Sequence, residues 1–278
     1  MGRCLQTVHT LKQNITGGSP EALTAGTSDS LQVPNFRFGT DAFLLEAWAG
    51  NSANACEYQI RSPNFHDNIR GLRLAAMFNP TLSGADGDPQ LLLPYLMKQR
   101  LYATDTLTVE VNGTATNNVA LDLLFYFEDL PGADQQIYRW DELEGQIENY
   151  VAIRVSVTAG ATGNYGTAVA FNNTDARLEA NRYYAILGAT SQLPCGLLTI
   201  TGFETSGRRI GMPLHWDERV SGGWFADISD RYDIPAIPVI NANNAGNINV
   251  EAADAATNVA TAATFIMAQL NQNFVPRQ

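Results

Sequence analysis

The sequence has few charged residues, and lysine is almost absent. Charged residues make up 16% of the 278 residues, against roughly 25% in typical globular proteins. The only lysines are Lys12 and Lys98. Charged residues, lysine above all, are depleted where proteins bury surface against each other. The composition therefore favours a chain whose surface is largely covered by neighbouring subunits, although a biased genome or secretion would produce it as well.

The sequence also lacks any run of Lys or Arg residues. Its formal net charge is −11, and the first dozen residues contain only Arg3 and Lys12 as basic side chains. Sequence-independent binding of nucleic acid depends on clustered basic groups that neutralise phosphates. We therefore expect no direct nucleic-acid binding.

No apolar run approaches the roughly 18 residues of a membrane-spanning helix, and the N-terminus lacks the apolar stretch of a signal peptide. The three cysteines, Cys4, Cys56 and Cys195, form no CxxC pair. Zinc and redox motifs are therefore not indicated. Cys56 and Cys195 lie in apolar-patterned segments, and we expect buried thiols in preference to a disulfide between them. That favours folding in a reducing compartment, the host cytoplasm.

Catalytic motifs are absent as well: there is no GxSxG, HExxH, P-loop or GxGxxG after a strand. Of the histidines His9, His66 and His215, the last is followed closely by Asp217 and Glu218. A hydrolase could use His215 as a general base. Adjacent residues of a strand point to opposite faces, however, so solvent-facing or subunit contacts are the preferred interpretation. We predict no enzyme activity, no cofactor, and no catalytic, cofactor-binding or metal-binding residue.

Three further groups of residues have competing interpretations. The tryptophans could stack on sugars, but core filling is preferred. Aspartates in two short clusters could bind calcium, but turn formation is preferred. One of the adjacent arginines Arg208 and Arg209 is expected to be buried against an acid. The tryptophans are Trp48, Trp140, Trp216 and Trp224, and the aspartates are Asp86, Asp88, Asp227 and Asp230.

Apolar and polar residues alternate with the two-residue period of strands in several segments. Residues 105–111 and 119–128 predict an antiparallel pair connected through Asn112-Gly113. Residues 150–158 predict another strand. Shorter candidates are 42–48, 54–62, 70–78, 91–97, 166–171, 182–190, 195–203, 207–213, 223–228, 236–241 and 246–251.

The two ends of the chain give different structural predictions. Residues 1–30 are polar and turn-rich after a short possible helix over Leu5–Leu11, and predict an arm ordered only by neighbouring subunits. Residues 252–270 fit both helical and strand spacing, and we favour a strand.

The strands and the turn signals between them predict an all-β protein. They fall into two groups of roughly eight, the number in one jelly roll. We expect a jelly-roll sandwich with two jelly rolls in tandem. The N-terminal arm would cover 1–30, the first jelly roll 31–160 and the second 161–278. A single elaborated sandwich is the alternative.

With these features, the chain resembles jelly-roll coat proteins of icosahedral viruses, most closely the compact double jelly-roll major capsid proteins of tailless bacteriophages. The resemblance covers most of 30–270 and is architectural, since no signature motif matches. It implies homotrimers that tile the shell of a virion, contacts with other virion proteins, and an underlying membrane or internal protein layer between shell and genome.

Three functions follow in order of preference. The first is a self-assembling viral capsid protein. The second is a carbohydrate-binding β-sandwich, such as a lectin or a receptor-binding virion module. The third is a β-sandwich hydrolase, which would need a cleft with paired carboxylates or a working His215.

Overall fold

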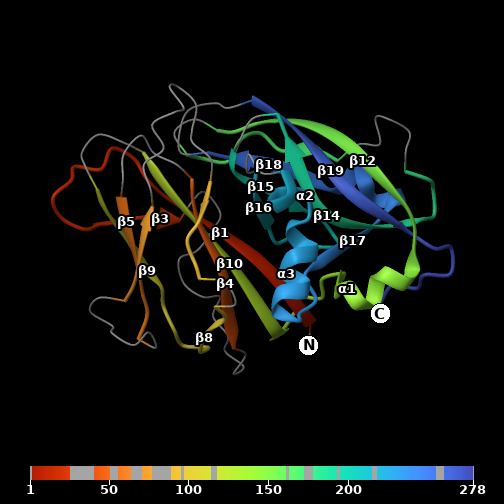
Figure 1. Cartoon of the computed structure of the whole chain (residues 1–278), viewed down its shortest axis with the longest axis horizontal. Helices are drawn as coiled ribbons and strands as arrows, with labels where there is room; N and C mark the ends of the chain where they lie inside the picture. Colours follow the sequence, from red (N-terminus) through yellow and green to blue (C-terminus); the bar gives the residue numbers. More distant parts are fainter. Residues whose placement is uncertain are drawn as a thin grey trace.

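A computed structural model describes most of the chain. The described residues are 2–25, 41–50, 56–63, 71–76, 89–94, 97–113, 118–160, 163–171, 178–192, 195–214, 218–254 and 260–277. Their strands form four antiparallel sheets packed in layers (Figure 1). The predicted all-β sandwich class is therefore confirmed.

The first half of the chain forms two of the sheets. Sheet I contains β1 (Gly2–Lys12), β3 (Thr24–Ala25), β4 (Ala42–Gly50), β7 (Gln90–Leu91), β8 (Gln99–Leu101) and β10 (Val119–Leu130). Sheet II contains β2 (Glu21–Ala22), β5 (Cys56–Arg61), β6 (Leu72–Ala76) and β9 (Thr108–Gly113).

The second half forms the other two. Sheet III contains β11 (Ile137–Tyr138), β12 (Ile147–Thr158), β14 (Tyr183–Ser191), β17 (Ile237–Asn241) and β19 (Ala260–Leu270). Sheet IV contains β13 (Val169–Ala170), β15 (Cys195–Thr201), β16 (Ile210–Leu214) and β18 (Asn249–Ala253). The short helices are α1 (Trp140–Leu143), η1 (Glu144–Gln146), α2 (Glu218–Gly222), α3 (Trp224–Tyr232) and η2 (Ala242–Asn247).

The strand order of the first two sheets is repeated in the last two. Sheet I runs β1-β10-β4-β7, with β3 next to β1 and β8 paired with β4. Sheet III runs β12-β19-β14-β17, with β11 next to β17. Sheet II runs β2-β9-β5-β6 and sheet IV runs β13-β18-β15-β16. When the short strands β3, β8 and β11 are set aside, the described part of each half has eight strands. In both halves, strands one, eight, three and six form one sheet, and strands two, seven, four and five form the other.

Sheet I is buried on both of its faces. Leu121 and Leu123 of β10 belong to a first hydrophobic core shared with sheet II, whereas Leu124 and Tyr126 belong to a second core shared with sheets III and IV. Figure 1 shows β5 and β9 on one side of β1, β10 and β4, and the strands of the second half on the other. Burial on both faces explains why β10 reads as a nearly continuous apolar run.

The predicted hairpin between 105–111 and 119–128 is wrong. Both segments contain strands, but β9 pairs with β2 and β5 in sheet II, and β10 pairs with β1 and β4 in sheet I. The chain crosses from one sheet to the facing sheet between them. The alternating apolar residues of both strands point into the first core from opposite sides, which local periodicity cannot distinguish from hairpin pairing.

The N-terminal arm and the helix over Leu5–Leu11 are also wrong for the described part of that segment. Residues 2–12 form β1, which pairs along its length with β10 and is almost entirely buried. The polar side chains of this strand suggested an exposed segment, but Thr7, His9 and Thr10 are buried. Thr7 and His9 make polar contacts with the second half of the chain, and the Thr10 hydroxyl donates to the Leu121 carbonyl within sheet I.

Two of the shorter strand predictions fail. Residues 223–228 lie largely in helix α3, where Trp224, Phe225, Ile228 and Tyr232 share the buried side, a helical spacing. The described residues of 91–97 hold only the end of the two-residue β7. The described tail forms β18 and β19, which confirms the preference for a strand.

The boundary between the halves also moves. A division after residue 160 assigns 147–158 to the first unit, but this segment is β12 and pairs with β19 along its length. The first set of strands ends at Leu130 and the second begins at Ile147, apart from the short β11. In the part of the chain that the structure describes, no helix is long and apolar enough to cross a membrane.

Candidate functional site

One histidine of the three lies in the described part of the chain, and it is buried. His9 Nδ1 lies 2.6 Å from Asp122 Oδ1, and His9 Nε2 lies 2.6 Å from the carbonyl oxygen of Gly163. The Tyr165 ring lies beside the imidazole with 5.4 Å between centroids. Because His9 and Asp122 are 0% exposed, no substrate reaches this pair, which joins β1 and β10 to the loop after β12.

The other residues of the hydrolase hypothesis cannot be placed. His66, His215 and Asp217 lie outside the described residues. Glu218 begins helix α2, but its side chain is not described. The described residues therefore provide no geometric support for the hydrolase hypothesis.

The predicted arginine contact is found within the chain. Arg209 Nε donates to Glu251 Oε2 at 2.9 Å, and the Arg209 guanidinium also lies 4.1 Å from the centroid of the Tyr165 ring. Arg208 donates to Gln6 Oε1 at 2.8 Å. The prediction that one of the two arginines is buried against an acid is confirmed for Arg209, which is mostly buried.

A second buried carboxylate was not singled out in the sequence. Glu46 of β4 is almost completely buried and accepts from Arg231 at 3.1 Å. Burial raises the pKa of Glu46 to about 7, although the backbone N–H of Ala47 and the charge of Arg231 both act to lower it. Arg231 also pairs with Asp227 one helical turn away.

Two tryptophans fill the core, as preferred from the sequence. Trp48 and Trp224 are both 0% exposed and meet edge to face, with 5.5 Å between ring centroids. Trp48 Nε1 donates to the carbonyl oxygen of Gly196 at 2.7 Å. Trp140 is partly buried at the start of α1, and Trp216 lies outside the described residues.

The structure confirms the prediction for the cysteines but not the turn predicted for two of the aspartates. Cys56 and Cys195 are free and buried, which confirms the prediction of buried thiols, and Cys4 is free and buried as well. Among the described residues no cluster of three metal-ligating side chains occurs. Asp227 and Asp230 lie in helix α3 and not in a turn, because they occupy the polar side of an amphipathic helix. Asp86 and Asp88 lie outside the described residues.

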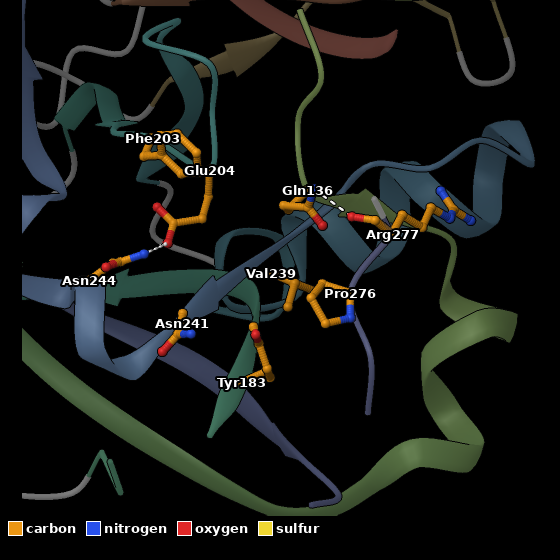
Figure 2. A pocket seen from close by; sticks show the side chains of 9 residues that line it. All are labelled: Gln136, Tyr183, Phe203, Glu204, Val239, Asn241, Asn244, Pro276 and Arg277. Carbon is orange, nitrogen blue, oxygen red and sulfur yellow. Dashed lines mark hydrogen bonds between the residues drawn. The ribbon is translucent and has the colours of Figure 1, made fainter. Parts of the chain in front are cut away.

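A pocket of about 180 Å³ opens at the end of the second half. One wall comes from the turn after β15, in which the Gly207 N–H donates to the Gly202 carbonyl at 2.9 Å. This turn places Phe203, 83% exposed, beside Glu204, 7% exposed. Figure 2 shows both side chains on one side of the pocket.

The opposite walls come from β14, β17, η2 and the C-terminal segment. Asn241 caps η2 by accepting from the Asn243 N–H at 2.9 Å, and Asn244 Nδ2 donates to Glu204 Oε1 at 3.0 Å. In the sequence, this Asn-rich segment only separates the strand candidates 236–241 and 246–251, and nothing in it indicates a pocket. The full lining is Gln136, Tyr183, Phe203, Glu204, Val239, Asn241, Asn244, Pro276 and Arg277 (Figure 2).

Comparison with known proteins gives no family. No protein-family model matches the chain, and no curated protein matches its sequence. Among solved structures, the protein YhaK from Escherichia coli aligns with a TM-score of 0.23 at 9% identity, covering 96% of this chain and 86% of that chain.

Viral coat proteins occur among the other weak structural likenesses. The STIV MCP aligns with a TM-score of 0.21 at 10% identity, covering 96% of both chains. The T=1 Penaeus vannamei nodavirus aligns with a TM-score of 0.22 at 10% identity, covering 96% of this chain and 98% of that chain. Scores this low assign neither family nor function, so the functional argument depends on the chain's own structure.

Proposed function

We propose that the chain is a structural protein of two jelly rolls in tandem, which assembles with copies of itself into the icosahedral shell of a virion. The observation that carries the proposal is the repeated strand order. A jelly roll consists of eight strands in two facing sheets, and the same order of eight strands in two sheets occurs in both halves.

The packing of the halves supports a rigid tile. Sheet I contributes to both hydrophobic cores, so the two units cannot rotate freely about a linker. Backbone and side chain contacts reinforce the junction: the Thr7 N–H donates to the Arg209 carbonyl at 2.9 Å, and the Gly211 N–H donates to Thr7 Oγ1 at 2.8 Å. A shell needs subunits that keep one shape.

Fold alone does not give function, because jelly rolls also occur in lectins and other proteins. The composition favours the shell. With charged residues at 16% and two lysines, the surface loses little charge solvation when a neighbour covers it. The net charge of −11 without a basic run favours a shell whose genome is held by another component, with a membrane or internal protein layer in between.

The proposal includes homotrimers as the unit of assembly, contacts with other virion proteins, and no catalytic role. Light scattering during size-exclusion chromatography tests the trimer. A mass three times the 30.2 kDa of the chain, or a multiple of that trimer, supports it. A mass of 30.2 kDa at every concentration up to the solubility limit contradicts it.

A further inference from the structure

The pocket of Figure 2 presents polar atoms that the chain itself leaves unused. Asn241 Oδ1 accepts from Asn243, so its Nδ2 is left as a donor. Asn244 Nδ2 donates to Glu204, so its Oδ1 is left as an acceptor. Within the described residues, neither of these two atoms has a hydrogen-bond partner, and the same is true of the Tyr183 hydroxyl. The pocket therefore offers donors and acceptors together, with amide orientations fixed by their neighbours.

Glu204 contributes a carboxylate whose hydrogen-bonding capacity is only partly used. Its Oε1 accepts from Asn244, whereas its Oε2 is buried and has no hydrogen-bond partner in the described part of the chain. Buried acceptors normally have a donor. A ligand hydroxyl or a bridging water supplies one without bringing a second charge into the pocket.

Arg277 does not make the pocket a site for anions. Its guanidinium pairs with Glu142 and donates to the carbonyl oxygen of Ile137 at 3.2 Å. Figure 2 shows that the charged end of Arg277 points away from the other lining residues, while its carbonyl oxygen accepts from Gln136. Glu204 is thus the one charged group of this lining that faces the pocket, which disfavours carboxylate and phosphate ligands.

A cationic side chain fits less well than a neutral polyol. Guanidinium and ammonium groups only donate hydrogen bonds and cannot accept from Asn241 Nδ2. A sugar hydroxyl both donates and accepts, so adjacent hydroxyls can satisfy Asn241, Asn244 and Glu204 together. The exposed Phe203 ring offers a flat apolar face for the C–H side of a sugar ring.

From these features, we infer that the pocket between the turn after β15 and helix η2 binds a single neutral saccharide unit. Its volume of about 180 Å³ is well above the roughly 10–15 Å³ that a single water requires, so the pocket has room for one sugar ring. The inference does not rest on the shell proposal, since the pocket lies wholly within one chain.

Saturation-transfer NMR on the intact protein tests the inference. The probes are the methyl glycosides of glucose, galactose, mannose and N-acetylglucosamine, with N-acetyl-arginine amide as the cationic comparison. We expect transfer to the ring protons of at least one glycoside and none to the arginine derivative. The method works for monomers and for large particles, so the state of assembly does not determine whether transfer is detected.

Two variants locate the binding. Phe203→Ala removes the exposed ring without disturbing the core and should weaken binding by about tenfold. Asn241→Asp keeps the cap on Asn243 but replaces the Nδ2 donor by an acceptor, and should abolish transfer to the glycosides. Tyr150→Ala, which removes another exposed aromatic ring, 57% exposed on β12, is the control and should bind as the parent does.

Three outcomes would overturn the inference. The first is no transfer to any of the glycosides. The second is transfer to the arginine derivative alone, which would make the pocket a cation site. The third is transfer that persists unchanged in both Phe203→Ala and Asn241→Asp, which would place the sugar elsewhere.

Discussion

His9 on β1 and Asp122 on β10 form a fully buried pair with 2.6 Å between Nδ1 and Oδ1. The other ring nitrogen faces the carbonyl oxygen of Gly163, which follows β12. A neutral imidazole has one N–H and can donate to only one of these oxygens. The ring and the carboxyl together must therefore hold two protons, either as imidazolium with carboxylate or as imidazole with carboxylic acid. In both states the Nε2–H donates to the Gly163 carbonyl, and this hydrogen bond links the first half of the chain to the second.

Asp122→Ala should destabilise the protein by about 3–5 kcal/mol, because removal of one member of a buried pair leaves its partner without compensation. Urea unfolding of the variant and the parent measures the difference. Lys12→Ala on the same strand is the matched control: Lys12 pairs with Glu21 at 3.4 Å on the surface, and its loss should cost less than about 1 kcal/mol. Equal effects of the two substitutions would contradict the assigned role.

Glu46 should make the stability depend on pH on the acid side of neutrality. Its pKa is raised from 4.5 to about 7 by burial, so the folded state keeps a proton that the unfolded state releases. The contribution of this proton is fully present below pH 4.5 and is lost as the pH rises to about 7. Relative to Glu46→Gln, the parent should lose up to about 3 kcal/mol over this range.

Denaturant unfolding of the parent and of Glu46→Gln at several pH values between 4 and 8 (about the range of the raised pKa) checks this prediction. The difference between the two unfolding free energies should change across the range and level off at both ends. A difference that stays constant with pH would mean that Glu46 has the same pKa in both states.

Removal of residues 2–12 should prevent folding. The sequence alone suggested an arm ordered only by neighbouring subunits, but β1 pairs with both β10 and β3 and contributes Leu5 and Val8 to the two cores. Far-ultraviolet circular dichroism and solubility of the truncated chain report the result. A soluble truncated chain with the β-sheet spectrum of the parent would contradict the position of β1.

None of the three cysteines should react with a thiol reagent in the native protein. All three are buried, and burial raises the pKa of the Cys4 thiol to about 12, although the charge of Arg208 acts in the opposite direction. Thiolates react and thiols do not. Ellman's reagent should therefore label the chain only after denaturation, and rapid labelling of the native protein would show that at least one of these sites opens.

Local pattern in the sequence predicts most strands but not their partners. The alternation over 119–128 correctly marks β10, yet it carries no information on whether β9 or β1 lies beside it, since either arrangement points Leu121 and Leu123 into the same core. For the same reason the two strand groups were found while their boundary was misplaced by one strand, β12.

The pocket was beyond the reach of sequence reasoning for a different reason. Its lining combines a turn after β15, the cap of η2 and the C-terminal segment, which meet only in the folded chain. Asn241 and Asn244 lie in a segment whose composition predicts a turn, and the structure gives each of them a specific partner. His9 looked unremarkable for a related reason: Asp122 is 113 residues away in the sequence.

Electron microscopy of the purified, concentrated protein in negative stain tests the central claim most directly. We predict closed shells or fragments of them, built from trimeric units with a pseudo-sixfold outline. A uniform field of monomers under all conditions of salt and pH, with no trimers in solution, would contradict a role in a viral shell.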